Sequence, residues 1–445
     1  MNTLSLFDRH RIGTLPLKNR IVMAPMTRAR ALQPGNIPSA LMAEYYRQRA
    51  SAGLIVTEAT QISPEGQGYS WTPGLHSAEQ IAGWQLTTRA VHQAGGVIFS
   101  QLWHVGRMSH ARFHADGQPV APSALAPDAQ VWVVDEQGRG QMVDCSPPRA
   151  LSRSDIQRIV ADYRQAARNA IAAGFDGVEV HGGNGYLIDQ FLRRTANQRT
   201  DEYGGSLNNR IRFAQEVLTA IGDAIGRERT GIRLSPFITQ RGMNDPQVID
   251  AILALAAWCE QQGIAFIHLA EADWDDAPAV PRRFRDTLRA TFSGTLIVAG
   301  NYDQQKAERI LDAGLADLVA FGRPFIANPD LPQRLLHRRP PGAPPPPRPC
   351  RSGFCPAGRW RPSAIPARCL AARRRAIPTI PSIRSIKSEN DPQNVTCRPW
   401  CRGCPHAGQT RPHAPSLRHR AAACRNVRLR VCSPTGSAEA GATHR

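Results

Sequence analysis

The sequence VEVHGGNGYL, residues 178–187, joins a short apolar strand to a glycine-rich loop. The loop carries an imidazole, an amide and a phenol at His181, Asn184 and Tyr186. His181 and Asn184 can both donate hydrogen bonds to one oxygen atom, and the Tyr186 hydroxyl can supply a transferable proton. This set is suited to polarising a carbonyl or nitro group while a neighbouring carbon is protonated. A histidine after a buried strand is more often structural than catalytic, so the flanking sequence has to decide.

Seven further apolar runs resemble the strand that ends at His181. They are residues 20–25, 54–59, 97–102, 231–234, 265–269, 295–299 and 318–321. Continuous Val, Ile and Leu runs are typical of strands buried on both faces of a parallel sheet. Residues 152–174 between two of the runs predict a helix, because apolar positions recur every three or four residues. Ser152 and Asp155 fit a capping box at its start, and Gly174 fits its end.

Eight strands alternating with helices predict an α/β fold, the (β/α)8 TIM barrel. An open doubly wound sheet fits less well, because no Gly-x-Gly-x-x-Gly motif follows the first strand. Residues 131–143 predict a hairpin that turns near Gly138, which we expect to form a lid after the third strand. Long ordered loops at the C-terminal face of a barrel usually build or cover the active site.

The last two predicted strands are followed by residues suited to a phosphate. Gly300 and Asn301 follow the seventh strand, and Gly322 and Arg323 follow the eighth. In such barrels the loops after these two strands commonly bind phosphate through backbone N–H groups and a helix N-terminus. An arginine there adds a bidentate positive charge. The alternative is two ordinary loop glycines and a surface arginine, and the pattern favours the phosphate site.

Taken together, these motifs resemble the old yellow enzyme family, and in particular its bacterial N-ethylmaleimide reductase and nitroester reductase members. The resemblance covers residues 6–335. It rests on the motifs NRIVMAPMTR (19–28), EATQIS (58–63), QLWHVGR (101–107), HGGNGYL (181–187), NQRTD (197–201) and GRPFI (322–326). It implies a non-covalent FMN across the C-terminal mouth of the barrel, with NADPH or NADH as electron donor. The implied reaction is reduction of activated C=C bonds in enones and maleimides, with nitro compounds and nitrate esters as further substrates.

The resemblance also implies which residues contact FMN. Thr27 would bond the C4 carbonyl side of the flavin, and Gln101 and Arg233 would contact its pyrimidine edge. The positive charge of Arg233 would favour the anionic reduced flavin; the alternative is a structural ion pair with a neighbouring carboxylate. The remaining implied contacts are main-chain ones to the ring at Pro25 and Ala59 and phosphate contacts at Gly300, Asn301, Gly322 and Arg323.

For the substrate, the resemblance implies that His181 and Asn184 bind the activating oxygen. Hydride would pass from the nicotinamide to the flavin and then to the β-carbon, while Tyr186 protonates the α-carbon. Many family members have a second histidine at the position of Asn184, and the His/Asn pair is also common. Tyr69 and Trp103 would shape the substrate pocket, although core packing is an equally good interpretation of both. No metal site is predicted in this part of the chain.

Charge and cysteine both divide the chain near residue 337. The net charge of the 445 residues is +19, yet residues 1–337 hold 34 basic and 33 acidic side chains. Only Cys145 and Cys259 of the ten cysteines lie there, which favours a reducing compartment. No signal peptide or membrane segment is evident. We therefore expect a soluble cytoplasmic monomer or weak dimer that acts on a small electrophilic substrate, without membrane partners.

Residues 338–445 do not resemble the family. They contain 21 Lys and Arg, 3 Asp and Glu, eight cysteines and 18 prolines, without a hydrophobic period, and so predict a disordered basic tail. The family would continue with Tyr-Gly-Gly and Tyr-Thr-Asp-Tyr-Pro segments, so out-of-frame translation is the favoured interpretation. A basic arm that binds nucleic acid non-specifically is the second. A zinc module is the third, and its candidate ligands are Cys397, Cys401, Cys404 and His406.

The sequence thus predicts two parts, a catalytic FMN-binding barrel at 1–337 and the tail at 338–445. One other enzyme class stays open, a dienoyl-CoA-type flavin reductase of the wider family. That class would normally carry iron–sulfur cysteines, and the cysteines of the tail do not follow a cluster spacing.

Overall fold

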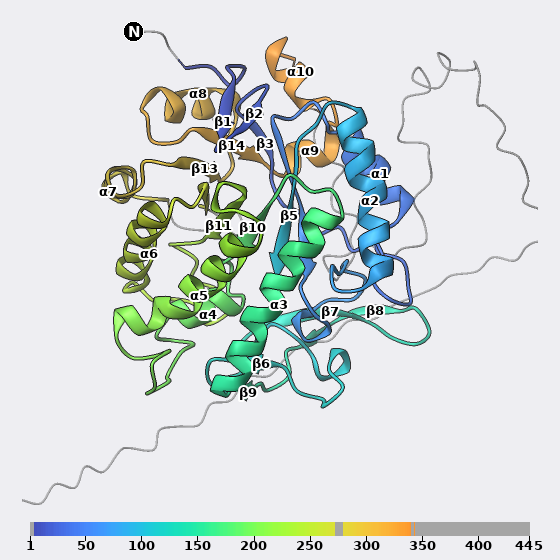
Figure 1. Cartoon of the computed structure of the whole chain (residues 1–445), viewed down its shortest axis with the longest axis vertical. Coiled ribbons are helices and arrows are strands. Elements are labelled where there is room, and N and C mark those ends of the chain that lie inside the picture. The colour runs from blue at the N-terminus through green and yellow to red at the C-terminus, as the bar shows by residue number, and fades with distance from the viewer. Residues whose placement is uncertain (1–3, 272–278, 340–341, 343–445) are drawn as a thin grey trace, which may run out of the picture. The chain divides into compact units, whose positions relative to one another are not determined.

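A closed barrel of parallel strands forms the centre of the protein (Figure 1). The structure, a computed structural model, describes residues 4–271, 279–339 and 342. The strands in their order around the barrel are β3 (Ile21–Met23), β4 (Leu54–Gln61), β5 (Ile98–Trp103), β10 (Gly177–His181), β11 (Thr230–Leu234), β12 (Phe266–Ala270), β13 (Thr295–Ala299) and β14 (Leu318–Phe321). β14 pairs with β3 and closes the ring, which confirms the predicted (β/α)8 barrel. The first strand is shorter than predicted and ends before Pro25, which has no N–H for a ladder bond.

Helices lie around the barrel (Figure 1). They are α1 (Ala40–Arg47), α2 (Ala78–Gln93), α3 (Arg153–Ala172), α4 (Leu187–Leu192), α5 (Leu207–Ile225), α6 (Val248–Gln262), α7 (Arg282–Thr291), α8 (Gln304–Asp312), α9 (Arg323–Ala327) and α10 (Leu331–Leu336). α3 begins at the predicted capping box: Ser152 Oγ accepts from the Asp155 N–H at 3.1 Å, and the Asp155 carboxylate accepts from the Ser152 N–H at 3.0 Å. The outward strand residues and the inner helix faces form one large apolar cluster.

Two hairpins, β1–β2 and β7–β8, accompany the barrel and pack in different places. β1 (His10–Ile12) and β2 (Leu15–Leu17) bring Ile12 and Leu17 into the apolar cluster that fills the N-terminal part of the barrel. β7 (Gln130–Val134) and β8 (Gly140–Asp144) form the predicted hairpin after the third barrel strand, with Gly138 at a φ of +74° in its turn. Ser70 binds this hairpin twice: its N–H donates to the Trp132 carbonyl at 3.1 Å, and its hydroxyl accepts from the Val134 N–H at 2.9 Å.

The interior of the barrel changes from apolar to polar along the strands. Phe99 and Phe266 lie in the apolar cluster near the N-terminal ends. Two residues further along the strands come Gln101 and His268, and the same step on β10 and β11 leads from glycine to Glu179 and to Arg233. Because alternate residues of a strand face the same side, this places a polar layer above an apolar one inside the barrel.

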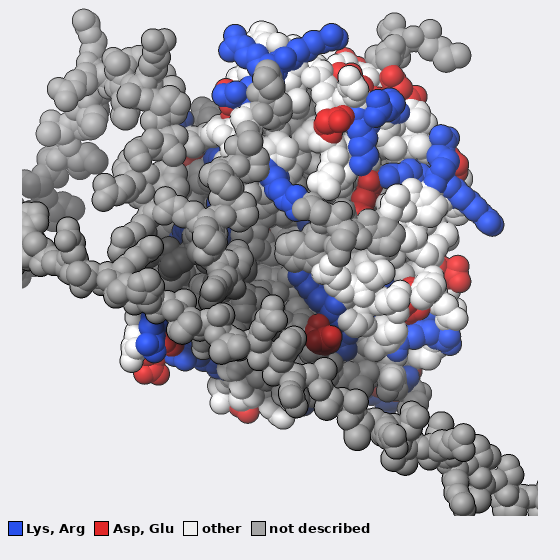
Figure 2. Space-filling model, turned by 180° about the vertical axis from the view of Figure 1, so that it is seen from behind, with Lys and Arg blue, Asp and Glu red and all other residues white. Residues whose placement is uncertain are grey.

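The surface of the barrel unit carries mixed charge. Figure 2 shows Lys and Arg interspersed with Asp and Glu over the coloured part of one face. Among the helices of the described ranges, none has the length and apolar character that crossing a bilayer requires. The zinc module predicted at Cys397, Cys401, Cys404 and His406 lies outside the described residues, and so does the predicted disordered tail apart from residues 338, 339 and 342.

We expect Gly231→Ala to destabilise the barrel by about 1–3 kcal/mol through overpacking. A Cβ atom at Gly231 would lie 2.2 Å from the Phe266 ring, which faces it from the paired position on β12. The free energy of unfolding in urea measures the effect. Adding Phe266→Leu to Gly231→Ala should recover part of the loss, and an equal or larger loss in the double variant would contradict this account of the packing.

Candidate active site

The residues predicted for the site lie at or beyond the C-terminal ends of the barrel strands. Since these strands are parallel, their C-terminal ends meet on one face of the barrel. The structure places Pro25 and Thr27 after β3, Ala59 in β4 and Tyr69 after it, Gln101 and Trp103 in β5, His181 at the end of β10 with Asn184 and Tyr186 after it, Arg233 in β11, Gly300 and Asn301 after β13, and Gly322 and Arg323 after β14.

Four of the predicted residues form an aromatic cluster around Tyr186. The Tyr186 ring lies edge-on to Trp103 and to His181, with a centroid separation of 4.9 Å in each case. Tyr69 stacks on Trp103 at 5.6 Å, and its hydroxyl lies 3.4 Å from the Tyr186 hydroxyl. The three tyrosine and tryptophan side chains share an apolar cluster with the β7–β8 hairpin. Tyr69 and Trp103 are therefore buried packing residues and neighbours of Tyr186 at the same time.

His181 is a neutral hydrogen-bond donor. The Gly183 N–H donates to His181 Nδ1 at 3.4 Å, which leaves the imidazole proton on Nε2. Burial, together with the positive charges of Arg233 and Arg241, lowers the pKa of His181 well below 6.5. A neutral imidazole with its proton on Nε2 can donate one hydrogen bond to a substrate oxygen.

The polar layer inside the barrel is centred on Glu179. Its carboxylate accepts from Gln101 Nε2 at 2.7 Å and bonds His268 Nδ1 at 2.6 Å, and all three side chains are buried. Burial alone would raise the pKa of Glu179, but His268, Arg233 and Gln101 outweigh it and hold the pKa below its usual value. Burial lowers the pKa of His268 and outweighs the neighbouring Glu179 carboxylate, which raises it.

This polar layer fits the pyrimidine edge of a flavin. Gln101 commits its amide nitrogen to Glu179, so its carbonyl oxygen is the end that can accept a bond from an imide N–H. Arg233, on β11 next to the strand of Glu179, supplies positive charge that acts on Glu179 in the same layer. Glu179 is thus a neighbouring carboxylate of the kind that the alternative interpretation of Arg233 requires. At the predicted phosphate end, a Cβ atom on Gly322 would meet only the Met26 side chain, at 3.5 Å and beyond, so a ligand could approach this backbone closely.

The predictions from the sequence did not identify the buried charged residues that hold the loops after β3 and β10. Glu58 lies next to a register shift in β4 and accepts from the N–H groups of Arg28 and Ala29, at 3.0 and 3.2 Å, in the loop after β3. Asp189 accepts from the Gly185 N–H at 2.9 Å and from Arg193 Nε at 2.8 Å, with both charged side chains buried. The sequence did contain a signal for Glu58 and for the polar residues Glu179 and His268, because each of them interrupts an apolar run.

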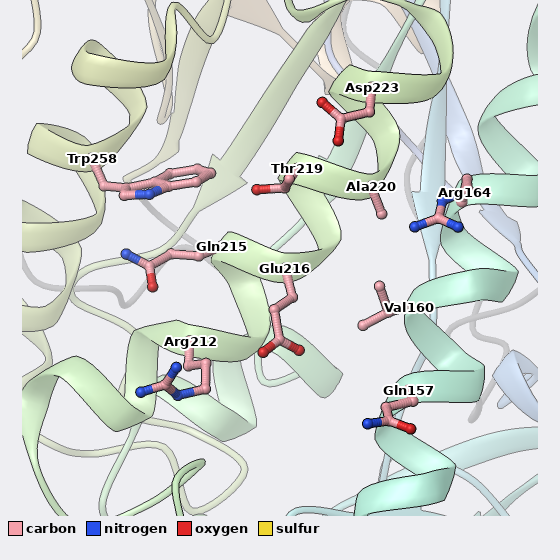
Figure 3. Close-up of a pocket in the computed structure, with 10 residues that line it drawn as sticks. All are labelled: Gln157, Val160, Arg164, Arg212, Gln215, Glu216, Thr219, Ala220, Asp223 and Trp258. Carbon is pink, nitrogen blue, oxygen red and sulfur yellow. The ribbon is translucent and has the colours of Figure 1, made fainter.

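Two hollows are lined by other residues than the predicted ones, and the second includes Tyr302, Phe321 and Pro324, the chain neighbours of the predicted phosphate residues. Figure 3 shows one of about 460 Å³ on the outer side of the barrel, where Trp258 of α6 lies opposite Gln215 and Thr219 of α5, with α3 on the far side. The second, of about 660 Å³, is lined by residues of α8, α9 and α10 and by Tyr302 and Phe321. None of the predicted site residues lines either hollow. In the described ranges, no group of three His, Cys, Asp or Glu residues is arranged to hold a metal ion.

The profile of one protein family, described as the NADH:flavin oxidoreductase / NADH oxidase family, matches residues 5–341. The chain belongs to this family. The match confirms the resemblance predicted from residues 6–335 and ends close to where that resemblance ended. The family's cofactors are those predicted, FMN with a reduced nicotinamide nucleotide as electron donor.

Individual family members are similar over the same part of the chain. The 12-oxophytodienoate reductase 1 of Oryza sativa subsp. japonica is 44% identical over 340 residues, which cover 75% of this chain and 86% of the relative. Chanoclavine-I aldehyde reductase of Penicillium roqueforti is 44% identical over 339 residues, covering 74% and 88%.

Two solved structures agree with the fold. Morphinone reductase in complex with tetrahydroNAD has a TM-score of 0.74 at 48% identity, covering 77% of this chain and 93% of that one. An old yellow enzyme homologue from Zymomonas mobilis has a TM-score of 0.74 at 40% identity, covering 81% and 98%. The chain is therefore a flavin oxidoreductase whose relatives include old yellow enzymes.

We expect His181 to make the folded protein less stable on acidification. Its pKa in the folded protein lies well below 6.5, the value that the unfolded chain should approach. Below about pH 6.5 the unfolded chain binds a proton that the folded chain does not, so the free energy of unfolding falls as the pH falls.

Urea unfolding at several pH values between about 7 and 5 tests this with His181→Asn as the comparison. The unchanged protein should lose more stability over this range than the variant. Other buried histidines, such as His268, contribute to both proteins and cancel in the difference. The same pH dependence in both proteins would mean that His181 is not held neutral.

Proposed function

We propose that this chain is an FMN-dependent NAD(P)H reductase of activated C=C bonds in enones and maleimides, with nitro compounds and nitrate esters as further acceptors. The observation that carries the proposal is the position of Tyr186. A phenol that can give up a proton packs at 4.9 Å against a neutral, donor-bearing His181. Both lie at the same end of the barrel as the Gln101–Glu179–Arg233 layer that fits a flavin.

The relatives' names support a carbonyl-bearing substrate. They are named as reductases of 12-oxophytodienoate, of morphinone and of chanoclavine-I aldehyde, and each of these compounds carries an oxo, ketone or aldehyde group. A carbonyl oxygen is the kind of acceptor that an imidazole N–H and an amide NH₂ can bind together.

Each side chain has a defined task in this reaction. When bound, FMN would supply the hydride chemistry that connects the reduced nicotinamide with the β-carbon of the alkene. His181 and Asn184 hold the activating oxygen and stabilise the negative charge that develops on it, an interaction worth roughly 2.7–4 kcal/mol per donor at such sites. Tyr186 then transfers its hydroxyl proton to the α-carbon.

For the cofactor, we propose that Gln101 accepts from the flavin imide and that Arg233 balances charge at the pyrimidine edge. Thr27 directly precedes Arg28 and Ala29, whose N–H groups Glu58 holds after β3, and we propose that its hydroxyl bonds the C4 carbonyl side of the ring. The further proposed contacts are Pro25 and Ala59 along the ring and Gly300, Asn301, Gly322 and Arg323 at the phosphate.

Residues 1–337 should be sufficient for flavin binding, because every proposed contact lies within them. We expect the full chain, and a chain ended after His337, to bind FMN in equal amounts and to be bleached by NADH or NADPH without oxygen. Addition of an enone should restore the oxidised spectrum. Absence of flavin from both proteins, also after addition of FMN, would overturn the proposed function. Flavin binding by the full chain alone would overturn the domain division.

Tyr186→Phe should separate the two halves of the reaction. Flavin reduction by NAD(P)H should stay nearly unchanged, while reoxidation by an enone should slow by about 10²–10⁴, the usual range for loss of a general acid. Stopped-flow absorbance of the flavin measures each half separately. Tyr69→Phe is the matched control, because it removes the hydroxyl 3.4 Å away and should change reoxidation only a few-fold. Equal slowing of both halves by Tyr186→Phe would count against its role as an acid.

A further inference from the structure

Ser235 lies one residue after β11, is almost completely buried, and bonds Asn184 twice. The Asn184 N–H donates to the Ser235 hydroxyl oxygen at 2.5 Å. The same hydroxyl donates to the side-chain oxygen of Asn184, Oδ1, at 2.9 Å. One serine therefore binds both the backbone and the side chain of a residue in the neighbouring loop.

The two bonds together determine which end of the Asn184 amide is exposed. A serine hydroxyl has a single hydrogen, and here its oxygen already accepts the Asn184 N–H. Its hydrogen must go to an acceptor, and Oδ1 is the acceptor that the structure offers. Since Oδ1 is bound to Ser235, Nδ2 with its two N–H groups is the end of the amide that can donate elsewhere. The opposite orientation would leave the buried serine hydrogen without an acceptor, which is unfavourable.

Neighbouring residues hold both Ser235 and Asn184 in place. A Cβ atom on Gly183 would lie 2.2 Å from Ser235 Oγ and 2.9 Å from its backbone nitrogen, so only glycine allows this approach. Arg241 Nη1 donates to the Asn184 carbonyl at 2.7 Å, and Arg193 Nη2 donates to the Ser235 carbonyl at 2.5 Å. Asn184 itself adopts a φ of +57°, a left-handed conformation that asparagine tolerates better than most residues.

We propose that Ser235 is a positioning residue that keeps the Asn184 amide turned with its nitrogen outward, and that this restricts the substrate to groups whose oxygen can accept two hydrogen bonds. With His181 protonated on Nε2, the loop then presents two donors. A carbonyl or nitro oxygen matches two donors, whereas a group that must itself donate does not. The inference rests on the oxygen-binding role proposed for Asn184.

A double-mutant cycle on the FMN-loaded, full-length protein tests this inference. The variants are Ser235→Ala, Asn184→Ala and the two combined, and the measurement is the Kd of cyclohex-2-enone for the oxidised enzyme in the absence of a reductant. Ser235→Ala should weaken binding by about two- to twelvefold, the size of one neutral hydrogen bond. In the Asn184→Ala background the same change should have a clearly smaller effect, because there is no amide left to orient and only the bond to the backbone N–H of residue 184 is lost.

Two controls separate orientation from loss of structure. Ser235→Thr keeps the hydroxyl and should bind the enone as the unchanged protein does. Ser100→Ala removes another buried strand hydroxyl, one without a hydrogen-bond partner among the described residues, and should leave binding unchanged.

The outcomes are distinct. An equal loss from Ser235→Ala in both backgrounds, or no loss in either, overturns the positioning role. Failure of Asn184→Ala to weaken binding overturns the proposed oxygen-binding role of Asn184 itself. If Ser235→Ala does not fold, Ser235→Thr and Ser235→Val replace it, because valine has a methyl group where threonine has its hydroxyl. Unchanged binding by Ser235→Thr with about two- to twelvefold weaker binding by Ser235→Val supports the role, and equal binding by the two overturns it.

Discussion

A buried carboxylate inside the barrel constrains the groups around it. Glu179 has no exposed surface, and an uncompensated charge at such a position is strongly destabilising. Gln101 and His268 bond it directly, and Arg233 adds positive charge. The bond to Glu179 also decides which end of the Gln101 amide is available to a cofactor. The groups that compensate the charge of Glu179 thus include the polar groups that are proposed to contact the flavin.

The loops above this layer hold one another. The end of β10 and the loop after it carry His181, Asn184 and Tyr186, so the two side chains proposed to bind the substrate oxygen and the proposed proton donor share one short piece of backbone. This piece is bound to the β11 side through Ser235, and the ion pair between Asp189 and Arg193 ties it to the carbonyls that follow β11. Groups held in this way keep their relative positions, which matters because a shift of about 1 Å can lower a rate on the order of a hundredfold.

Aromatic packing connects the same loop to the other side of the barrel mouth. Tyr186 contacts Trp103 at the end of β5, and Trp103 stacks on Tyr69 from the loop after β4. The β7–β8 hairpin joins this cluster through Trp132 and is bonded to Ser70, the neighbour of Tyr69. The proposed proton donor is therefore buried among rings from separate loops, which limits both its motion and its contact with water.

Much of the fold follows from local sequence. Strand positions, the start of α3 and the β7–β8 hairpin were predictable, because apolar runs, a capping box and a glycine turn are signals within a few residues. The motifs around His181, Asn184 and Tyr186 also indicated the family. Each of these features depends on neighbours along the chain, so one sequence is enough to reveal it.

The tertiary structure alone decided how polar groups are paired and turned. In the sequence, Glu179 and His268 only interrupt apolar runs. They are 89 positions apart, and the closure of the barrel brings them into contact. Ser235 and Asn184 are 51 positions apart, and their bonds set the direction of an amide whose two ends have the same shape. Composition and spacing carry no information on that direction. It is set by which donors and acceptors a closed barrel places within hydrogen-bond distance, and by the free energy required to leave a buried one unpaired.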